Sequence, residues 1–167
     1  MAEISTQKIK ELREQTGAGI MDAKRALEAS GGDMAKAMQI LKEQGLARAA
    51  KKAERVARQG VIDAYIHAGG RIGALVEVNC ETDFVARTDD FRRLVHDIAM
   101  QVAATNPKVV GNEPDLDTSA IGEEEILLKQ PFIKDPSLTI EDLVKNSIAK
   151  VGENVIIRRF ARFELGG

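Results

Sequence analysis

The strongest constraint on the fold is an apolar run that leads, through a short polar stretch, into a helical pattern. Residues Ile72 to Val78 are β-rich, and residues Phe91 to Val102 place apolar side chains at the three- and four-residue spacing of a helix face. The stretch from Asn79 to Arg87 lies between them, so it must turn a strand into a helix. Thr82 and Asp83 suit a helix N-terminus there, because a side-chain oxygen can accept a free backbone N–H.

Phe84 is a large aromatic side chain placed among polar neighbours at this corner. Two interpretations are open. The ring packs on the core of its own domain, which is the commonest position of phenylalanine. Alternatively, the ring is exposed and serves as an apolar anchor for a partner. The chain has no tryptophan and one tyrosine, so a partner contact must rely on Phe, Met, Arg and aliphatic side chains.

A β-hairpin precedes the corner, and a third strand is expected near the end of the chain. The β-rich runs Val61 to His67 and Ile72 to Asn79 flank a turn with two glycines. Thr139 is expected to cap a helix that ends at Gly152. The tail Asn154 to Leu165 alternates in polarity and should pair with the hairpin. Its expected buried face consists of Val155, Ile157, Ala161, Phe163 and Leu165.

The N-terminal third predicts helices. Residues 5–45 contain three short amphipathic patterns separated by glycine turns, the last ending at Gly45. Residues 46–59 are alanine-rich and basic, which predicts a linker helix stopped by Gly60. We therefore predict an α+β protein with a three-helix unit at 1–45, a basic linker helix at 46–59, and a core at 60–167. In that core a small antiparallel sheet packs against helices, and residues 107–125 form a loop.

Composition excludes several classes of function. The formal net charge is −2, which gives no overall attraction to nucleic acid or an anionic membrane. Cys80 is the single cysteine, so an internal disulfide and a multi-cysteine metal site are excluded, and a reducing, cytoplasmic environment is expected. The first residues lack the apolar segment of a signal peptide, and no apolar run approaches the roughly 20 residues of a membrane span.

No arrangement typical of enzymes stands out. Cys80 with His67 or His96 would be a thiol–imidazole pair, but their spacing favours ordinary packing or surface positions. We expect no catalytic residue, no bound metal and no cofactor. The basic run at 48–58 has no interleaved aromatic residues, so a solvated helix face is favoured over a phosphate-binding surface.

Three stretches carry a resemblance to a known family. They are Lys10 to Asp22, Glu77 to Ala86 with Thr-Asp-Phe-Val at its centre, and Gly152-Glu153-Asn154 with Arg158-Arg159-Phe160. In this order and spacing the chain resembles the bacterial translation elongation factor Ts family.

The resemblance implies a function and a set of site residues. Members of the family are guanine-nucleotide exchange factors for elongation factor Tu; they bind its GDP form and promote GDP release by displacing Mg²⁺. The first unit resembles a ubiquitin-associated domain that docks on the GTPase, with Arg13, Ile20 and Met21 as contact residues. Thr82, Asp83, Phe84 and Val85 match the motif that displaces the Mg²⁺ ion.

The chain differs from many members in one region. Only 23 residues, 107–129, occupy the place where those members have a long helical insertion or a second sheet unit, so the chain resembles a compact form. Two points are left open. One is whether the chain forms a homodimer. The other is a rival hypothesis, a nucleic-acid or ribosome-associated adaptor that uses residues 48–58.

Overall fold

Three helices form the N-terminal unit, as predicted. In the computed structural model, which describes residues 4–167, they are α1 (Thr6–Thr16), α2 (Ile20–Ala29) and α3 (Met34–Lys52). Ser5 and Asp33 cap α1 and α3 by accepting a backbone N–H three residues further on. The helices enclose a small core of their own, which consists of Leu12, Ala23, Ala26, Leu27 and Ala37.

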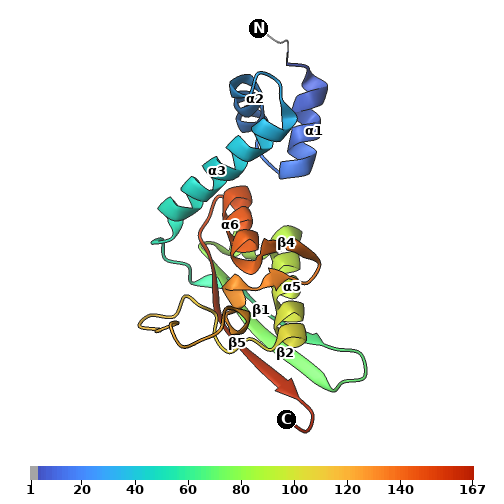
Figure 1. The fold of residues 1–167 in the computed structure, drawn as a ribbon, viewed down its shortest axis with the longest axis vertical. Helices are drawn as coiled ribbons and strands as arrows, with labels where there is room; N and C mark the ends of the chain where they lie inside the picture. Colours follow the sequence, from blue (N-terminus) through green and yellow to red (C-terminus); the bar gives the residue numbers. More distant parts are fainter. Residues whose placement is uncertain (1–3) are drawn as a thin grey trace.

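The predicted end of the third helix is wrong. Gly45 lies inside α3, which continues without a break to Lys52. The glycine serves helix packing, because α3 lies against α6 (Ile140–Val151) and a Cβ at Gly45 would be 3.2 Å from the Cβ of Ala149. A residue with no side chain lets the two helices approach closely. This contact joins the N-terminal unit to the rest of the molecule (Figure 1).

The linker helix is also shorter than predicted. Of residues 46–59, those after Lys52 form a turn and then irregular backbone until β1 begins at Gln59. The carbonyls of Ala53 and Arg55 accept hydrogen bonds from the side chain of Asn154, which replaces the next helical turn. The division of the chain into units at 1–45, 46–59 and 60–167 stays a prediction.

Substitution of Gly45 tests the close approach of α3 and α6. Gly45→Val should lower the free energy of unfolding by about 1–3 kcal/mol, because the added branches force the two helices apart. Ala47→Val is the matched control, since Ala47 is exposed on the same helix; it should cost only the difference in helix propensity, about 0.5 kcal/mol. Urea titrations measure both values. Equal losses would show that Gly45 has no special role.

The sheet has three antiparallel strands in the order β1 (Gln59–Ile66), β2 (Ile72–Cys80), β5 (Val155–Glu164). The predicted hairpin and the predicted third strand are both confirmed. Helices α5 (Asp89–Thr105) and α6 cover one face of the sheet (Figure 1). The main core lies between these helices and the sheet, with Val76, Val78 and Ile157 from the sheet and Phe91 and Ile98 from α5. The α+β architecture predicted from sequence is confirmed.

A β-bulge changes which residues of β5 face the core. Glu77 pairs with Arg159 while Val78 pairs with Ile157, so Arg158 has no partner across the ladder. Beyond this point the strand's alternation is reversed, and Phe160 packs on the core instead of Ala161. The predicted burial of Phe163 and Leu165 is therefore wrong; Phe163 is 75% exposed.

Short elements connect α5 to α6. They are two single 3₁₀ turns, η1 (Glu123–Glu125) and η2 (Leu127–Lys129), and a small hairpin of β3 (Pro131–Phe132) and β4 (Asp135–Thr139). Residues 107–122 have no regular helix or strand, as predicted for the loop. Thr139 caps α6 as expected. Within residues 4–167, every helix is too short or too polar to cross a membrane.

Candidate functional site

The corner between β2 and α5 is a sharp turn followed by one short helix. Strand β2 ends at Cys80, and α4 (Asp83–Ala86) begins three residues later. Thr82 is its N-cap, with extended backbone and a hydroxyl that accepts the N–H of Val85 at 3.4 Å. A second cap, Thr88, starts α5 by accepting the N–H of Phe91. The polar residues at this corner therefore determine its shape, as their types predict.

Within α4 the side chains point in different directions. Ala86 is buried and Val85 packs against the core, which fixes the short helix to the domain. Phe84 is 85% exposed, so the interpretation that its ring packs on its own core is wrong. Asp83 is also exposed and forms an ion pair with Arg87 at 2.8 Å. The corner thus presents an aromatic ring next to a carboxylate on an anchored turn.

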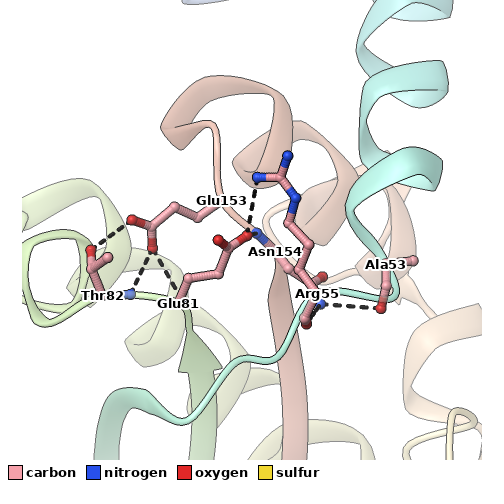
Figure 2. A network of polar contacts seen from close by, with 6 residues as sticks. All are labelled: Ala53, Arg55, Glu81, Thr82, Glu153 and Asn154. Atoms are coloured by element: carbon pink, nitrogen blue, oxygen red, sulfur yellow. Dashed lines mark hydrogen bonds and ion pairs between the residues drawn. The ribbon is translucent and has the colours of Figure 1, made fainter.

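The carboxylate of Glu153 holds this corner from the side. Its Oε2 accepts the backbone N–H groups of Glu81 at 3.1 Å and of Thr82 at 3.0 Å, and its Oε1 accepts the Thr82 hydroxyl at 2.6 Å (Figure 2). Hydrogen bonds to a charged acceptor are the stronger kind. Glu153 lies in the turn between α6 and β5, so a residue far along the chain fixes the backbone that carries Phe84.

A second carboxylate, that of Glu81, makes a contact in the opposite direction. Glu81 Oε1 accepts the backbone N–H of Asn154 at 2.7 Å, and the Arg55 guanidinium lies 3.7 Å from the same oxygen. Figure 2 shows the two glutamates reaching past each other, each to the backbone of the opposite segment. The corner, the turn before β5 and the segment after α3 therefore form one polar network.

The single cysteine helps to hold the corner and does not form a reactive pair with a histidine. Cys80 is buried, and its thiol donates a hydrogen bond to the carbonyl of Thr82 at 3.1 Å. Burial, together with the negative charge of Glu153, raises the pKa of Cys80 to about 11. The histidines are engaged elsewhere: His96 contacts Asp63 at 2.9 Å and His67 contacts the hydroxyl of Tyr65 at 3.1 Å.

The raised pKa of Cys80 predicts how stability depends on pH. The folded state holds the thiol proton more tightly than the unfolded state, whose thiol has a pKa near 9.0. This contribution is complete below pH 9.0 and is lost as the pH rises toward about 11. Urea titrations from pH 8 to 11 should therefore show a steeper loss of stability for the wild type than for Cys80→Ala. Parallel curves would contradict this assignment.

The residues expected on the N-terminal unit also share one region. Ile20 and Met21 begin α2 and are each 57% exposed. Arg13, near the end of α1, donates from its Nε to the carbonyl of Ala18 in the intervening turn at 3.3 Å. The structure thus holds Arg13 against the turn that leads into α2, the helix that begins with the two exposed apolar side chains.

The two sets of predicted residues lie on different units. Within residues 4–167, no hydrogen bond or ion pair joins Arg13, Ile20 or Met21 to the corner at 82–85. The same part of the chain has no group of three His, Cys, Asp or Glu side chains placed to hold a metal ion. Both surfaces present exposed apolar side chains, Ile20 and Met21 on one and Phe84 on the other.

Comparison with known proteins places this arrangement in a family. A family model described as elongation factor TS matches residues 3–126. Elongation factor Ts of Carboxydothermus hydrogenoformans is 52% identical over 194 residues, covering 98% of this chain and 89% of the relative. Elongation factor Ts of Thermoanaerobacter sp. (strain X514) is 52% identical over 194 residues, covering 98% and 95%. The chain belongs to the elongation factor Ts family. Elongation factor Ts of Synechococcus sp. (strain JA-3-3Ab) is 51% identical over 198 residues, covering 98% of this chain and 69% of the relative.

Membership of the elongation factor Ts family confirms the resemblance that the sequence motifs indicate. The match to the Carboxydothermus relative extends over 194 positions, whereas the chain has 167 residues. This relative therefore has residues with no counterpart here. That difference agrees with a compact member of the elongation factor Ts family.

Sequence reasoning missed the residues that support the corner. Glu81, Glu153 and Asn154 fall within the stretches that resemble elongation factor Ts, but their positions in sequence gave no reason to connect them. The sequence offers one signal for them: two polar residues lie between a glycine that ends a helix, Gly152, and the first residue of a buried strand, Val155. Polar residues in such a position need partners, because the backbone there is partly buried.

Proposed function

We propose that the chain is a guanine-nucleotide exchange factor for elongation factor Tu. It binds the GDP form and promotes GDP release by displacing Mg²⁺ during translation elongation, in the cytoplasm where elongation takes place. No covalent step is involved, so the chain is not an enzyme. The observation that carries the proposal is the exposed Phe84 ring beside Asp83, on a corner held by hydrogen bonds to Glu153, in a chain of the elongation factor Ts family.

Each residue of the corner has a role in this proposal. A GTPase holds its nucleotide through backbone N–H groups and through Mg²⁺ on the phosphates, so loss of the ion leaves phosphate charge uncompensated. Phe84 wedges into the GTPase and Asp83 disturbs the contacts around the ion. Thr82 and Val85 hold these two side chains in place, Thr82 as the helix cap and Val85 through its packing on the core.

The size of the effect requires more than one contact. An acceleration of about 10⁴-fold needs about 5.5 kcal/mol of preference for the state in which GDP leaves. Burying one Phe side chain contributes about 1.5–3 kcal/mol. The remaining preference must come from docking elsewhere, and the exposed Ile20 and Met21 with Arg13 are the proposed surface. By linkage, the factor and the nucleotide weaken each other's binding equally, so an incoming nucleotide helps to release the factor.

A magnesium titration tests the displacement step. Release of a fluorescent GDP analogue from elongation factor Tu is measured with and without the chain at several Mg²⁺ concentrations. The acceleration should be largest at low millimolar Mg²⁺ and should shrink when a chelator removes the ion in advance, because the factor then has no ion to displace. An acceleration that is the same with and without Mg²⁺ would exclude displacement of Mg²⁺ as the mechanism.

The adaptor hypothesis has less support. Two arginines of the basic run are engaged in ion pairs, Arg48 with Asp22 at 2.8 Å and Arg55 with Glu81 at 3.7 Å. We therefore propose that the chain does not bind nucleic acid directly. Salt separates the two hypotheses: affinity for a nucleic acid falls steeply as salt rises, whereas an apolar wedge is affected far less. RNA binding that fell steeply with salt, without GDP release, would favour the adaptor.

We also propose that the chain forms a homodimer through the open face of its sheet. Residues on that face leave a hollow of about 530 Å³ lined by Ile66, Leu75, Phe163 and Leu165. The charged neighbours Glu77 and Arg159 neutralise each other at 2.7 Å. Two copies related by a two-fold axis would bury these apolar side chains against each other.

Light scattering after gel filtration tests this contact. The wild type should elute with twice the mass of the 167-residue chain, and Phe163→Asp should shift it to the monomer, because a carboxylate cannot be buried there without a partner. Arg92→Asp, on the exposed side of α5, is the control and should stay dimeric. A monomeric wild type at high micromolar concentration would contradict the proposal.

A further inference from the structure

Two surfaces proposed to contact one partner must be held at a set distance from each other. Ile20 and Met21 lie on the N-terminal unit, and Phe84 lies on the corner of the sheet domain. The chain joins the two units through α3 and the exposed segment at 53–58. The packing of α3 on α6 joins the two units on one side, and the contacts that hold this segment complete the connection, so both sets of contacts determine the distance.

Asn154 contacts both the segment after α3 and the segment before α4. It is 2% exposed, and its side-chain amide donates to the carbonyls of Ala53 at 3.2 Å and Arg55 at 2.8 Å. Its own backbone N–H donates to the Glu81 carboxylate at 2.7 Å. One buried residue therefore binds the segment after α3 and the segment before α4 at the same time (Figure 2).

The amide is the group that this position requires. The two carbonyls lie where α3 has ended, so they have no helical N–H to accept from. An asparagine side chain offers two N–H groups from one nitrogen, which matches two acceptors. An aspartate of the same shape would place one carboxylate oxygen against both carbonyl oxygens and would repel the segment.

Glu153 acts on the corner alone. All three of its hydrogen bonds go to Glu81 and Thr82, immediately before α4. Neighbouring residues in one turn thus do two different things: Glu153 orients the helix that carries Phe84, and Asn154 ties that helix to the segment leading from the docking unit.

We infer that Glu153 and Asn154 are positioning residues for nucleotide exchange, neither of which needs to touch the partner. The inference rests on the proposed exchange function and deepens it. Together with the packing of α3 on α6, Asn154 fixes the distance between the docking surface and Phe84, so that binding at the first surface presents the ring to its site at high effective concentration. Glu153 fixes the direction of the ring once it arrives.

The two roles predict different kinetic signatures. GDP release from elongation factor Tu is measured by stopped flow over a range of factor concentrations. Asn154→Asp should raise the half-saturating concentration about ten-fold with little change in the maximal rate, because the two contacts no longer reinforce each other. Glu153→Gln should lower the maximal rate about ten-fold with little change in half-saturation, because the ring is presented less accurately.

Matched controls separate these effects from general damage. Asn146→Asp, on the exposed side of α6, makes the same chemical change as Asn154→Asp. Glu141→Gln, also at an exposed position of α6, makes the same change as Glu153→Gln. Both should keep the wild-type curve. Because Asn154→Asp buries a charge and risks misfolding, insertion of two glycines between Glu54 and Arg55 serves as a second variant. It loosens the same segment without altering Asn154, and it too should raise the half-saturating concentration.

A distance measurement tests the inference without any partner. Spin labels are attached to Lys24→Cys on α2 and Arg92→Cys on α5, both exposed, while the buried Cys80 stays unlabelled. The wild type should give a narrow distance distribution, and Asn154→Asp and the insertion should broaden it. If both variants stay as narrow as the wild type, Asn154 does not fix the distance and the inference is overturned.

The outcomes distinguish failure of the inference from failure of the proposed function. If the wild type does not accelerate GDP release, the exchange function is wrong, and the role of these residues in exchange falls with it. If the wild type accelerates release and both variants match it in maximal rate and half-saturation, the function stands and the positioning roles are wrong. The predicted split of the two parameters, with controls unchanged, supports both.

Discussion

Phe84→Ala should reduce the acceleration of GDP release by about ten-fold or more while leaving the fold unchanged. The ring is 85% exposed in the isolated chain, so its removal takes almost no contact from the folded state. In a complex the same ring would be buried, and loss of a buried Phe side chain removes about 1.5–3 kcal/mol, which corresponds to a factor of about 10 to 150. Stopped-flow release at saturating factor measures the change.

The control for this prediction is the stability of the variant itself. The urea midpoint of Phe84→Ala should match that of the wild type, since substitutions at exposed positions usually change stability by less than about 0.5 kcal/mol. If release stays as fast as with the wild type, Phe84 takes no part in exchange and the docking unit must carry the effect. If stability falls instead, the ring has a structural role that its exposure does not indicate.

Phe91→Ala should have the opposite profile, a large loss of stability. Phe91 is fully buried at the start of α5, among the sheet residues and helices of the main core. Truncating a buried phenylalanine costs about 3–5 kcal/mol, because apolar contacts are lost and a cavity remains. A domain of this size has about 5–15 kcal/mol in total, so the variant should unfold at a much lower urea concentration.

Any loss of exchange in Phe91→Ala should follow from unfolding alone. The test is to measure GDP release in conditions where circular dichroism shows the variant to be folded. There it should accelerate release nearly as the wild type does, because the exposed corner is intact. A variant that is fully folded but inactive would show that Phe91 also helps to shape the corner. The two phenylalanines, seven positions apart, thus separate function from stability.

The sequence predicts the main elements because their patterns are local. Apolar periodicity marks α5, glycines mark the hairpin turn, and Ser5, Asp33, Thr82 and Thr139 are the caps that their residue types indicate. The open apolar face of the sheet was missed because the bulge at Arg158 is not visible in the alternation. Gly45 was misinterpreted because a glycine that ends a helix and one that lets two helices meet have the same local sequence.

The candidate site also contains residues that the sequence predicts and residues that it does not. Thr82 to Val85 are recognisable because their residue types and order are distinctive, and the exposure of Phe84 could not be decided from pattern since the ring suits a core equally well. Glu153 and Asn154 contact residues more than 70 positions away. Such contacts depend on how the strands pair, and no local rule connects them.

Release of a fluorescent GDP analogue from elongation factor Tu, followed by stopped flow with and without the wild-type chain, tests directly whether the chain is an exchange factor. We expect an acceleration of several orders of magnitude at saturating concentrations of the chain, with a rate that rises hyperbolically with that concentration. A release rate that is unchanged by the chain, at concentrations where a complex is detected by gel filtration, would contradict the claim that this chain is an exchange factor.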